Sequence, residues 1–244
     1  MTYLESRMAV LNRKHEWTKK HAARKTVKIF VFRHGHTSFN QLHKFCGWRD
    51  SKLTDLGKVD ARKVAKKMHS KHVDVAFHSS LSRSVDTMEI ALSGHSELKV
   101  KLCDDRLIER SYGELEGKTH TWFVKSEGKH DLVEYLHWHK TDFLNYNKTK
   151  ELIDKFGKKD LMHIRRGYSV TPPGGESIKD VEKRVKSFIS DLLNISKKYH
   201  VNVALSVHGN SMRPLRRYFE KLSVKEMMHL ENPWDEVFVY TVKV

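Results

Sequence analysis

Apolar residues along this chain follow two patterns that alternate with each other. Residues 27–32 and 73–77 have the composition or alternation of strands. Apolar residues within 56–68 and 81–92 recur at helical spacing, and the helix expected over 56–68 carries Lys and Arg on its opposite face. Strands that alternate with helices are typical of βαβ units. The pattern therefore predicts an α/β fold with a mainly parallel central sheet and helices on both of its faces, a three-layer α/β/α arrangement.

The second half of the chain continues this scheme after an interruption. Residues from about 118 to 164 show no strand pattern, only apolar residues at helical spacing, which predicts a helical insertion. Beyond the breaker Thr171–Gly175, the pattern predicts a strong helix over 178–193, a strand over 201–207 and a closing strand over 237–244. Without an internal repeat or a low-complexity linker, a single domain over residues 27–244 is expected.

Residues 1–26 form a basic N-terminal extension, with seven Lys and Arg against two Glu. Leu4, Met8, Leu11 and Trp17 have helical spacing and predict a short surface helix or a basic arm. No motif in this extension supports binding to nucleic acid or to a membrane.

Composition narrows the class of protein. The 244 residues are 39% hydrophobic, enough for a folded core, and no apolar run approaches the ~20 residues of a membrane span. Two cysteines, Cys46 and Cys103, make no disulfide framework, so a reducing, cytoplasmic setting is expected. The net charge of +16 favours anionic partners such as phosphorylated metabolites or nucleic acid, although a basic surface without a dedicated partner is the simpler explanation.

Chemically versatile side chains gather where the predicted strands end. Arg33-His34-Gly35 follows the first strand, His208-Gly209-Asn210 follows a later one, and Arg83 lies on the first turn of the helix after the strand 73–77. Glu109 adds a carboxylate next to a glycine turn. The carboxyl ends of parallel strands share one edge of a sheet, where ligands bind, so we expect these groups to converge.

Such a set suits phosphoryl transfer through a histidine. A neutral imidazole nitrogen can attack phosphorus, guanidinium groups can neutralise the equatorial oxygens, and a carboxylic acid can protonate the departing alkoxide. Arginine binds phosphate with two parallel hydrogen bonds, which makes it well suited to this task. If all the cations are side chains, no metal is required. His-x-His pairs at 34–36 and 137–139 have chelating spacing but no Cys or third ligand near them in sequence, so surface histidines are the better explanation.

Six blocks of the chain, in order, resemble the histidine phosphatase superfamily and within it the cofactor-dependent phosphoglycerate mutases. They are R-H-G-H-T-S-F-N (33–40), C-G-W-R-D-S-K-L-T-D-L-G (46–57), S-S-L-S-R-S-V-D-T (79–87), R-L-I-E-R-S-Y-G-E-L-E-G (106–117), R-R-G-Y-S-V-T-P-P-G-G-E-S-I-K-D (165–180) and V-H-G-N-S-M-R-P-L (207–215). The resemblance implies a phosphoglycerate-mutase-like fold over residues 27–244.

The resemblance also implies roles for individual residues. His34 would be the nucleophile that becomes phosphohistidine, Glu109 the general acid and base, and Arg33, Arg83 and His208 the lining of the phosphoryl pocket. Residues that would hold phosphate or the glycerate part are Asn40, Cys46, Gly47, Tyr112, Gly209 and Asn210, and the pair Arg165 and Arg166 would bind the substrate carboxylate. The pair favours a mutase, because plain phosphatases of the superfamily usually lack it.

The implied activity is the interconversion of 3- and 2-phosphoglycerate in glycolysis and gluconeogenesis, primed by 2,3-bisphosphoglycerate and without a metal. The resemblance allows a homodimer, whereas a membrane partner is not expected and nucleic acid is disfavoured. Two alternatives stay open: a histidine-dependent phosphatase of a small phosphorylated metabolite, and a basic nucleic-acid-binding module on the same fold.

Departures from the mutase pattern keep the phosphatase alternative open. His36 stands where mutases usually carry Glu or Gln, His120 where they carry a substrate-binding lysine, and Asn232–Asp235 in place of a short glycine-containing turn. The segment 120–165 is longer than in typical mutases, which predicts a remodelled lid, and no counterpart of the tail that shields the phosphoenzyme in some mutases follows Val244.

Overall fold

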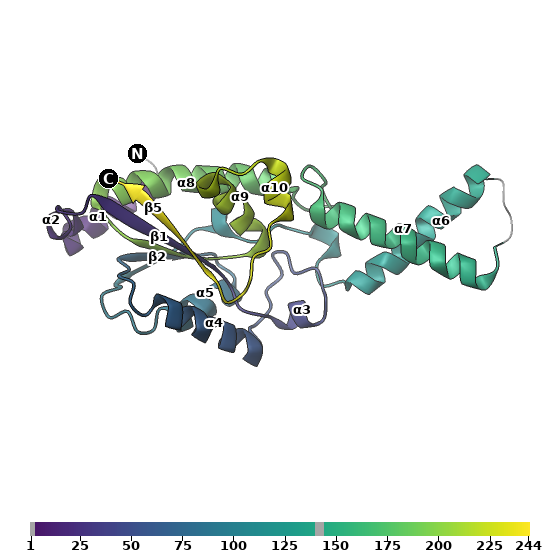
Figure 1. Ribbon diagram of the computed structural model, residues 1–244, viewed down its shortest axis with the longest axis horizontal. Coiled ribbons are helices and arrows are strands. Elements are labelled where there is room, and N and C mark those ends of the chain that lie inside the picture. Colours follow the sequence, from purple (N-terminus) through teal and green to yellow (C-terminus); the bar gives the residue numbers. More distant parts are fainter. Residues whose placement is uncertain (1–2, 140–143) are drawn as a thin grey trace.

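A mainly parallel sheet forms the middle layer of the protein (Figure 1), whose computed structural model describes residues 3–139 and 144–244. Within these residues the sheet has five strands in the order β3-β2-β4-β1-β5. The strands are β1 (Thr26–Arg33), β2 (Val75–His78), β3 (Val100–Cys103), β4 (Val203–Val207) and β5 (Val237–Lys243). All neighbours pair in parallel except β5, which pairs antiparallel with β1. The predicted α/β fold is thereby confirmed.

Strand β3 is the one strand that the sequence pattern did not predict. Its four residues alternate, with Val100 and Leu102 buried and Lys101 and Cys103 exposed. Four residues give too short an alternation to stand out from the neighbouring loops. The strand is important for the site, because it carries the chain to the segment that contains Glu109.

Helices α4 (Asp55–Met68) and α5 (Ser82–Ala91) cover one face of the sheet, where Phe30 and Phe32 of β1 point. The stripe predicted for α4 is only partly right, because Leu56 and Val59 are exposed while Val64 and Met68 are buried. The reason is a close approach at the start of the helix. Gly57 packs its backbone against His36, where a Cβ would lie 2.0 Å from the carbonyl oxygen, and this contact turns the Gly57 side of α4 inward.

Helices α8 (Ile178–Tyr199) and α9 (Gly209–Glu220) lie on the other face, against Ile29 and Val31 of β1. The N-terminal helices α1 (Tyr3–His15) and α2 (Trp17–Lys20) join this layer. Leu4, Met8 and Trp17 are buried in the same apolar cluster as the inner side of α8. The stripe predicted in the N-terminal extension is therefore the contact through which the extension packs onto the domain.

The predicted helical insertion is a hairpin of two long helices, α6 (His120–His139) and α7 (Tyr146–Arg166), which projects from the body of the protein (Figure 1). Two glycines let the helices cross closely. A Cβ on Gly128 would lie 1.9 Å from the Ile153 carbonyl oxygen, and one on Gly157 would lie 2.0 Å from that of Val124. The hairpin begins at His120 and ends at Arg166. Both residues lie near Arg33 and Gly209, at the carboxyl edge of the sheet.

The remaining elements are short. They are α3 (Ser38–Gln41), α10 (Val224–His229) and the 3₁₀ turns η1 (Asp105–Leu107) and η2 (Gly113–Leu115). Among the described residues, no helix has both the length and the apolar composition needed to cross a membrane.

Candidate active site

The two His-Gly strand ends lie side by side. In the parallel pair, Arg33 of β1 lies opposite Val207 of β4, and the His34 backbone N–H continues the ladder by donating to the Val207 carbonyl oxygen at 2.9 Å. As a result the His34 and His208 rings lie 5.0 Å apart, and both are buried. Gly35 is required here, because a Cβ would lie 2.2 Å from the Gly57 carbonyl oxygen.

Two guanidinium groups flank these histidines. Arg83, on the first turn of α5, is fully buried and donates to the carbonyl oxygens of Gly47 at 2.7 Å and Arg49 at 3.1 Å. Arg33 donates to the Asn232 carbonyl oxygen at 3.0 Å. The Nε of each arginine has no protein partner among the described residues. The backbone thus fixes one side of each guanidinium and leaves donors for an anion.

Glu109 reaches the histidines from the segment after β3. Its Oε1 accepts from the backbone N–H of Arg110 at 2.8 Å and of Asn210 at 3.1 Å. A carboxylate oxygen of Glu109 and one ring nitrogen each from His34 and His208 lie within 4.8 Å of one another. The five side chains predicted at the strand ends are therefore brought together.

Burial among cations sets the charge state of the histidines. Burial first, and then Arg83 and Arg33, hold the pKa of His34 well below its usual value. Burial and Arg83 likewise keep the pKa of His208 low, so both imidazoles are neutral at pH 7. The Nδ1–H of His34 faces the Gly35 carbonyl oxygen at 2.8 Å, which leaves the lone pair on Nε2.

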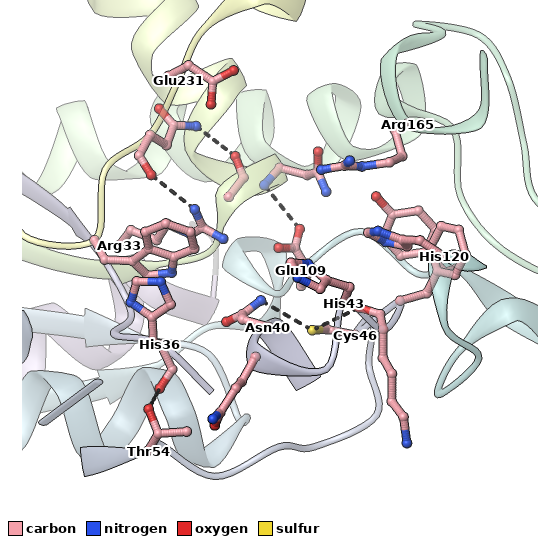
Figure 2. A pocket seen from close by; sticks show the side chains of 18 of the residues that line it. Arg33, His36, Asn40, His43, Cys46, Thr54, Glu109, His120, Arg165 and Glu231 are labelled. Atoms are coloured by element: carbon pink, nitrogen blue, oxygen red, sulfur yellow. Dashed lines mark hydrogen bonds between the residues drawn. The ribbon is translucent and has the colours of Figure 1, made fainter. Parts of the chain in front are cut away.

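A cavity of about 800 Å³ opens in front of these groups (Figure 2). Figure 2 shows Glu109 in its middle, with Arg33 on one side and Arg165 and His120 on the other. The predicted binding residues that line it are Asn40, Cys46, Tyr112, Arg165, Arg166, Gly209 and Asn210. The lining does not include Gly47, nor the buried side chains of His34, Arg83 and His208. The Gly47 carbonyl oxygen accepts from Arg83.

The binding residues differ in how they are held. Asn40 Nδ2 lies 3.6 Å from the Cys46 sulfur, and burial raises the pKa of the Cys46 thiol, so that the thiol is neutral. Gly209 lies beside Arg33, and a Cβ there would make an ordinary van der Waals contact with the guanidinium carbon at 3.4 Å. An amide and a neutral thiol thus lie side by side at this end of the cavity.

The arginine pair at the end of α7 lies across the cavity from the histidines. Arg166 donates to the Met228 carbonyl oxygen at 3.0 Å and to Glu231 Oε1 at 2.8 Å, whereas Arg165 is exposed. Beside Arg165, His120 rests edge-on against Phe45. Burial, together with Arg165 and His43, lowers the pKa of His120 to about 4, so this ring is uncharged at neutral pH.

Several residues of the site were not assigned from the sequence. Trp234 stacks on His36 with 3.7 Å between ring centroids, and the Arg33 guanidinium lies 4.2 Å above the same indole. His36 is held by the buried Asp60, 2.7 Å from its Nδ1. His36 and Trp234 are two of the departures from the mutase pattern, but only the fold shows that they touch each other.

Two further residues of the site are Ser79, which contacts His208, and Arg213, which faces the cavity. Ser79, directly after β2, has its hydroxyl 2.7 Å from His208 Nε2 and thereby fixes the orientation of that ring. Arg213 of α9 lines the cavity, and burial lowers its pKa to about 10. Arg213 lies in one of the six blocks, yet an arginine within a helix carries no local signal that it faces a cavity.

His34, Glu109 and His208 together have a geometry that could hold a metal ion. The charge around them argues for a different ligand. Arg33 and Arg83 both act on these histidines and disfavour an added positive charge. The same two cations favour a phosphoryl group.

Comparisons with known proteins agree with this chemistry. The family model described as "Histidine phosphatase superfamily (branch 1)" matches residues 29–145 and 139–243. A 2,3-bisphosphoglycerate-dependent phosphoglycerate mutase of Chlamydia caviae is 32% identical over 217 residues, which is 87% of this chain and 92% of that protein.

Two solved structures show the same fold. A phosphoglycerate mutase from Bacillus anthracis has a TM-score of 0.64 at 22% identity, covering 90% of this chain and 89% of its own. A mycobacterial glucosyl-3-phosphoglycerate phosphatase has a TM-score of 0.64 at 21% identity, covering 88% of this chain and 90% of its own. Mutase and phosphatase structures are thus equally similar to this one.

Proposed function

Because this chain belongs to the histidine phosphatase superfamily, we propose that it is a phosphoglycerate mutase that interconverts 3- and 2-phosphoglycerate through a phosphohistidine on His34. The observation that carries the proposal is the neutral, buried His34 among Arg33, Arg83, His208 and Glu109. Two of these neighbours, Arg33 and Glu109, line a cavity that Arg165 and Arg166 line as well. In this proposal residues 27–244 form the catalytic domain, residues 118–164 its helical insertion and residues 1–26 an extension.

His34 performs the first chemical step. Its Nε2 lone pair forms the bond to phosphorus while the bond from phosphorus to the substrate oxygen breaks. Glu109 gives a proton to the departing oxygen and, in the return step, takes one from the incoming hydroxyl group. Arg33, Arg83 and His208 hold the phosphoryl oxygens, and His208 Nδ1, without a protein partner among the described residues, is available to donate.

The distribution of cations fits a priming molecule with negative groups at both ends. Arg33 lines the cavity on one side of Glu109, and buried Arg83 acts on the same two histidines. Arg165 lies on the other side of Glu109, and Arg166 lines the cavity as well. 2,3-Bisphosphoglycerate, bound between these two groups of arginines, would supply the phosphoryl group that first loads His34. The residues present therefore suit the cofactor that the curated relatives are named for.

The proposal is tested by loading the protein with 2,3-bisphosphoglycerate and measuring its intact mass. We expect one phosphoryl group on the wild-type protein and none on His34→Asn. An enzyme-coupled assay should then show 2-phosphoglycerate formed from 3-phosphoglycerate without release of inorganic phosphate. A wild-type protein that takes up no phosphoryl group from 2,3-bisphosphoglycerate would refute the proposed mutase.

A phosphatase is the second candidate, and His120 is the observation that favours it. Mutases carry a substrate-binding lysine where His120 stands, and His120 is neutral above a pKa of about 4, so it supplies no charge to hold a phosphoglycerate. In this candidate water takes the phosphoryl group from His34. Release of one phosphate per substrate consumed, without formation of 2-phosphoglycerate, would identify the phosphatase.

A further inference from the structure

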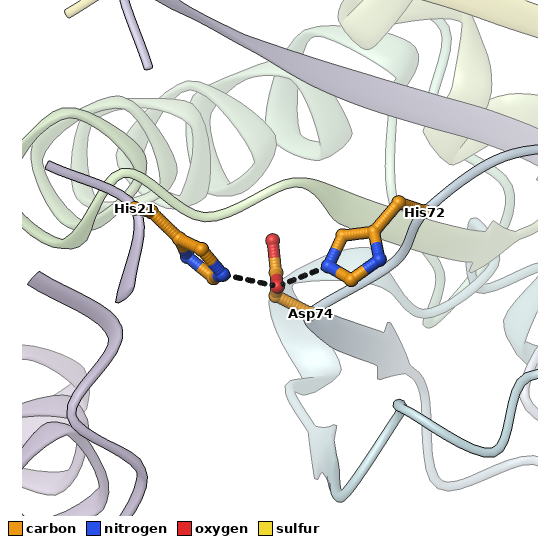
Figure 3. Close-up of side chains that lie close together, drawn as sticks. All are labelled: His21, His72 and Asp74. Carbon is orange, nitrogen blue, oxygen red and sulfur yellow. Dashed lines mark hydrogen bonds and ion pairs between the residues drawn. The ribbon is translucent and has the colours of Figure 1, made fainter. Parts of the chain in front are cut away.

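A second group of histidines and a carboxylate lies at the amino edge of the same sheet. His21 precedes β1, and His72 and Asp74 precede β2. Figure 3 shows the two imidazoles pointing at Asp74 from opposite sides. Asp74 Oδ1 lies 3.4 Å from His21 Nε2 and 2.8 Å from His72 Nε2. The three potential ligand atoms lie within 4.8 Å of one another.

The surroundings of Asp74 orient its carboxylate. The other oxygen, Oδ2, accepts from Arg24 at 2.6 Å and from the backbone N–H of Asn202 at 2.7 Å. Arg24 is fixed in turn by donating to the His200 carbonyl oxygen at 2.8 Å. These bonds occupy Oδ2 and direct Oδ1 to the two imidazoles.

An outer carboxylate is present as well. Glu97 Oε1 lies 4.0 Å from Nδ1 of His72, the nitrogen on the far side of that ring from Asp74. Glu97 also accepts from His95 Nδ1 at 2.9 Å, which holds it in place. A metal-binding imidazole usually donates its second N–H to a carboxylate, and Glu97 lies slightly beyond hydrogen-bond distance of that position on His72.

We propose that His21, His72 and Asp74 bind a divalent transition-metal ion of the zinc type, which ties the N-terminal extension to the sheet. Two imidazole nitrogens and one carboxylate oxygen are a common zinc ligand set, with water in the fourth position. The His72 side chain is 47% exposed, so an ion can enter from solvent and a water ligand has room.

The distances support this ligand set. At zinc–ligand bonds of about 2.0–2.2 Å, tetrahedral neighbours lie about 3.3 Å apart. The separation of 3.4 Å between His21 Nε2 and Asp74 Oδ1 is close to this value. The separation of 2.8 Å between His72 Nε2 and Asp74 Oδ1 has to widen by roughly half an ångström. The rings stand at 84° to each other with centroids 6.0 Å apart, so they do not stack. Their two nitrogens and the Asp74 oxygen lie within 4.8 Å of one another.

The site differs from the chelating pairs that the sequence alone suggests. Its ligands come from positions 21, 72 and 74, and only the fold unites the first with the others. The guanidinium of Arg24 adds one positive charge nearby. It is bonded to Asp74 Oδ2, the carboxylate oxygen that faces away from the two imidazoles. We therefore expect an affinity below that of closed four-ligand zinc sites.

The test is a titration of the chelator-treated, full-length protein with Zn²⁺ alone, in competition with a chromophoric chelator. The decisive variant is His72→Ala, because His72 is half-exposed and its removal spares Asp74 and Arg24. The matched control is His130→Ala, an exposed histidine on α6. Each titration is repeated in a His34→Asn background, which removes a ligand from the catalytic group of histidines.

We expect one Zn²⁺ equivalent on the wild-type and His130→Ala proteins and at least tenfold weaker binding by His72→Ala. Co²⁺ should give the visible absorption of a four-coordinate site in the first two proteins only. Zn²⁺ should raise the melting temperature of the wild type and not that of His72→Ala. The conservative variant His72→Gln is measured alongside. Weak Zn²⁺ binding by this variant, at an unchanged melting temperature of the metal-free protein, would exclude a general loss of structure as the cause. Equal Zn²⁺ binding by wild type and His72→Ala, or none by the wild type, would overturn the proposal.

Discussion

The two ends of the central sheet carry nearly the same side chains in different electrostatic surroundings. At the carboxyl edge, His34, His208 and Glu109 lie near two guanidinium groups, those of buried Arg83 and half-buried Arg33. At the amino edge, His21, His72 and Asp74 have one guanidinium, bonded to the far oxygen of the carboxylate. The histidines and carboxylate alone do not decide what a cluster binds. In our two proposals the arginines around them do, because they make the first cluster suited to an anion and leave the second able to accept a cation.

Removal of a guanidinium from the carboxyl edge should therefore have the largest effect. In Arg83→Met the side chain keeps much of its volume but loses the charge, and we expect phosphoryl transfer to slow by about 10³-fold, the effect of losing one preorganised donor. Rapid-quench measurement of His34 phosphorylation tests this. The control is Arg62→Met, an exposed arginine on α4. A loss below tenfold in a variant that folds normally would refute a role of the Arg83 guanidinium in phosphoryl transfer.

Removal of the proton-donating carboxyl group of Glu109 should have the second largest effect. Glu109→Gln keeps acceptors for the N–H groups of Arg110 and Asn210 but cannot donate a proton, so kcat should fall by about 10²–10³-fold. With p-nitrophenyl phosphate, whose leaving group needs no proton, the fall should be much smaller. Glu114→Gln, an exposed neighbour, is the control. Equal losses on both substrates would contradict a role of Glu109 in proton transfer.

Much of the carboxyl-edge cluster could be predicted from the sequence, because its residues follow strand ends. His34 and His208 each come directly after an apolar run, and parallel strands bring such positions to one edge. Arg83 follows the same logic through the first turn of a helix. Local pattern plus one rule of topology was enough.

The rest depends on contacts between segments that no local pattern connects. His36 and Trp234 are separated by most of the chain yet stack on each other and on Arg33. His21 meets Asp74 only because the extension packs on α8 through Leu4 and Met8. Strand β3 and the inward turn of α4 were missed or misjudged because short elements and backbone contacts leave weak patterns.

The pH dependence of stability should also report on the buried histidines of the carboxyl edge. Folding lowers the pKa values of His34 and His208 below 6.5, so the unfolded chain binds more protons than the folded one below that pH. The free energy of unfolding should keep the full contribution of these neutral rings above about pH 6.5. Below that pH it should fall, with a slope of up to about 1.4 kcal/mol per pH unit for each buried histidine.

Urea unfolding of the wild type and of His208→Asn between pH 8 and pH 5 measures this slope. The variant should lose roughly one proton's worth of the dependence. His130→Asn, exposed on α6, should leave the slope unchanged. A free energy of unfolding that stays constant between pH 6.5 and pH 5 would contradict the buried neutral state of the two rings.

His120 lines the cavity but belongs to neither cluster. We expect its substitution to have the smallest effect, because the ring is uncharged. Its pKa of about 4 keeps it neutral beside Arg165. His120→Lys would add the cation that the mutase pattern has there, and we expect the KM for 3-phosphoglycerate to fall by about three- to tenfold with kcat nearly unchanged, as for uniform binding. The gain should shrink with added salt, as charge screening requires. His130→Lys, on the same helix but away from the cavity, should change neither constant. If KM instead stays constant or rises, the negative groups of the substrate do not lie at the hairpin end of the cavity, and Arg165 is not their partner either.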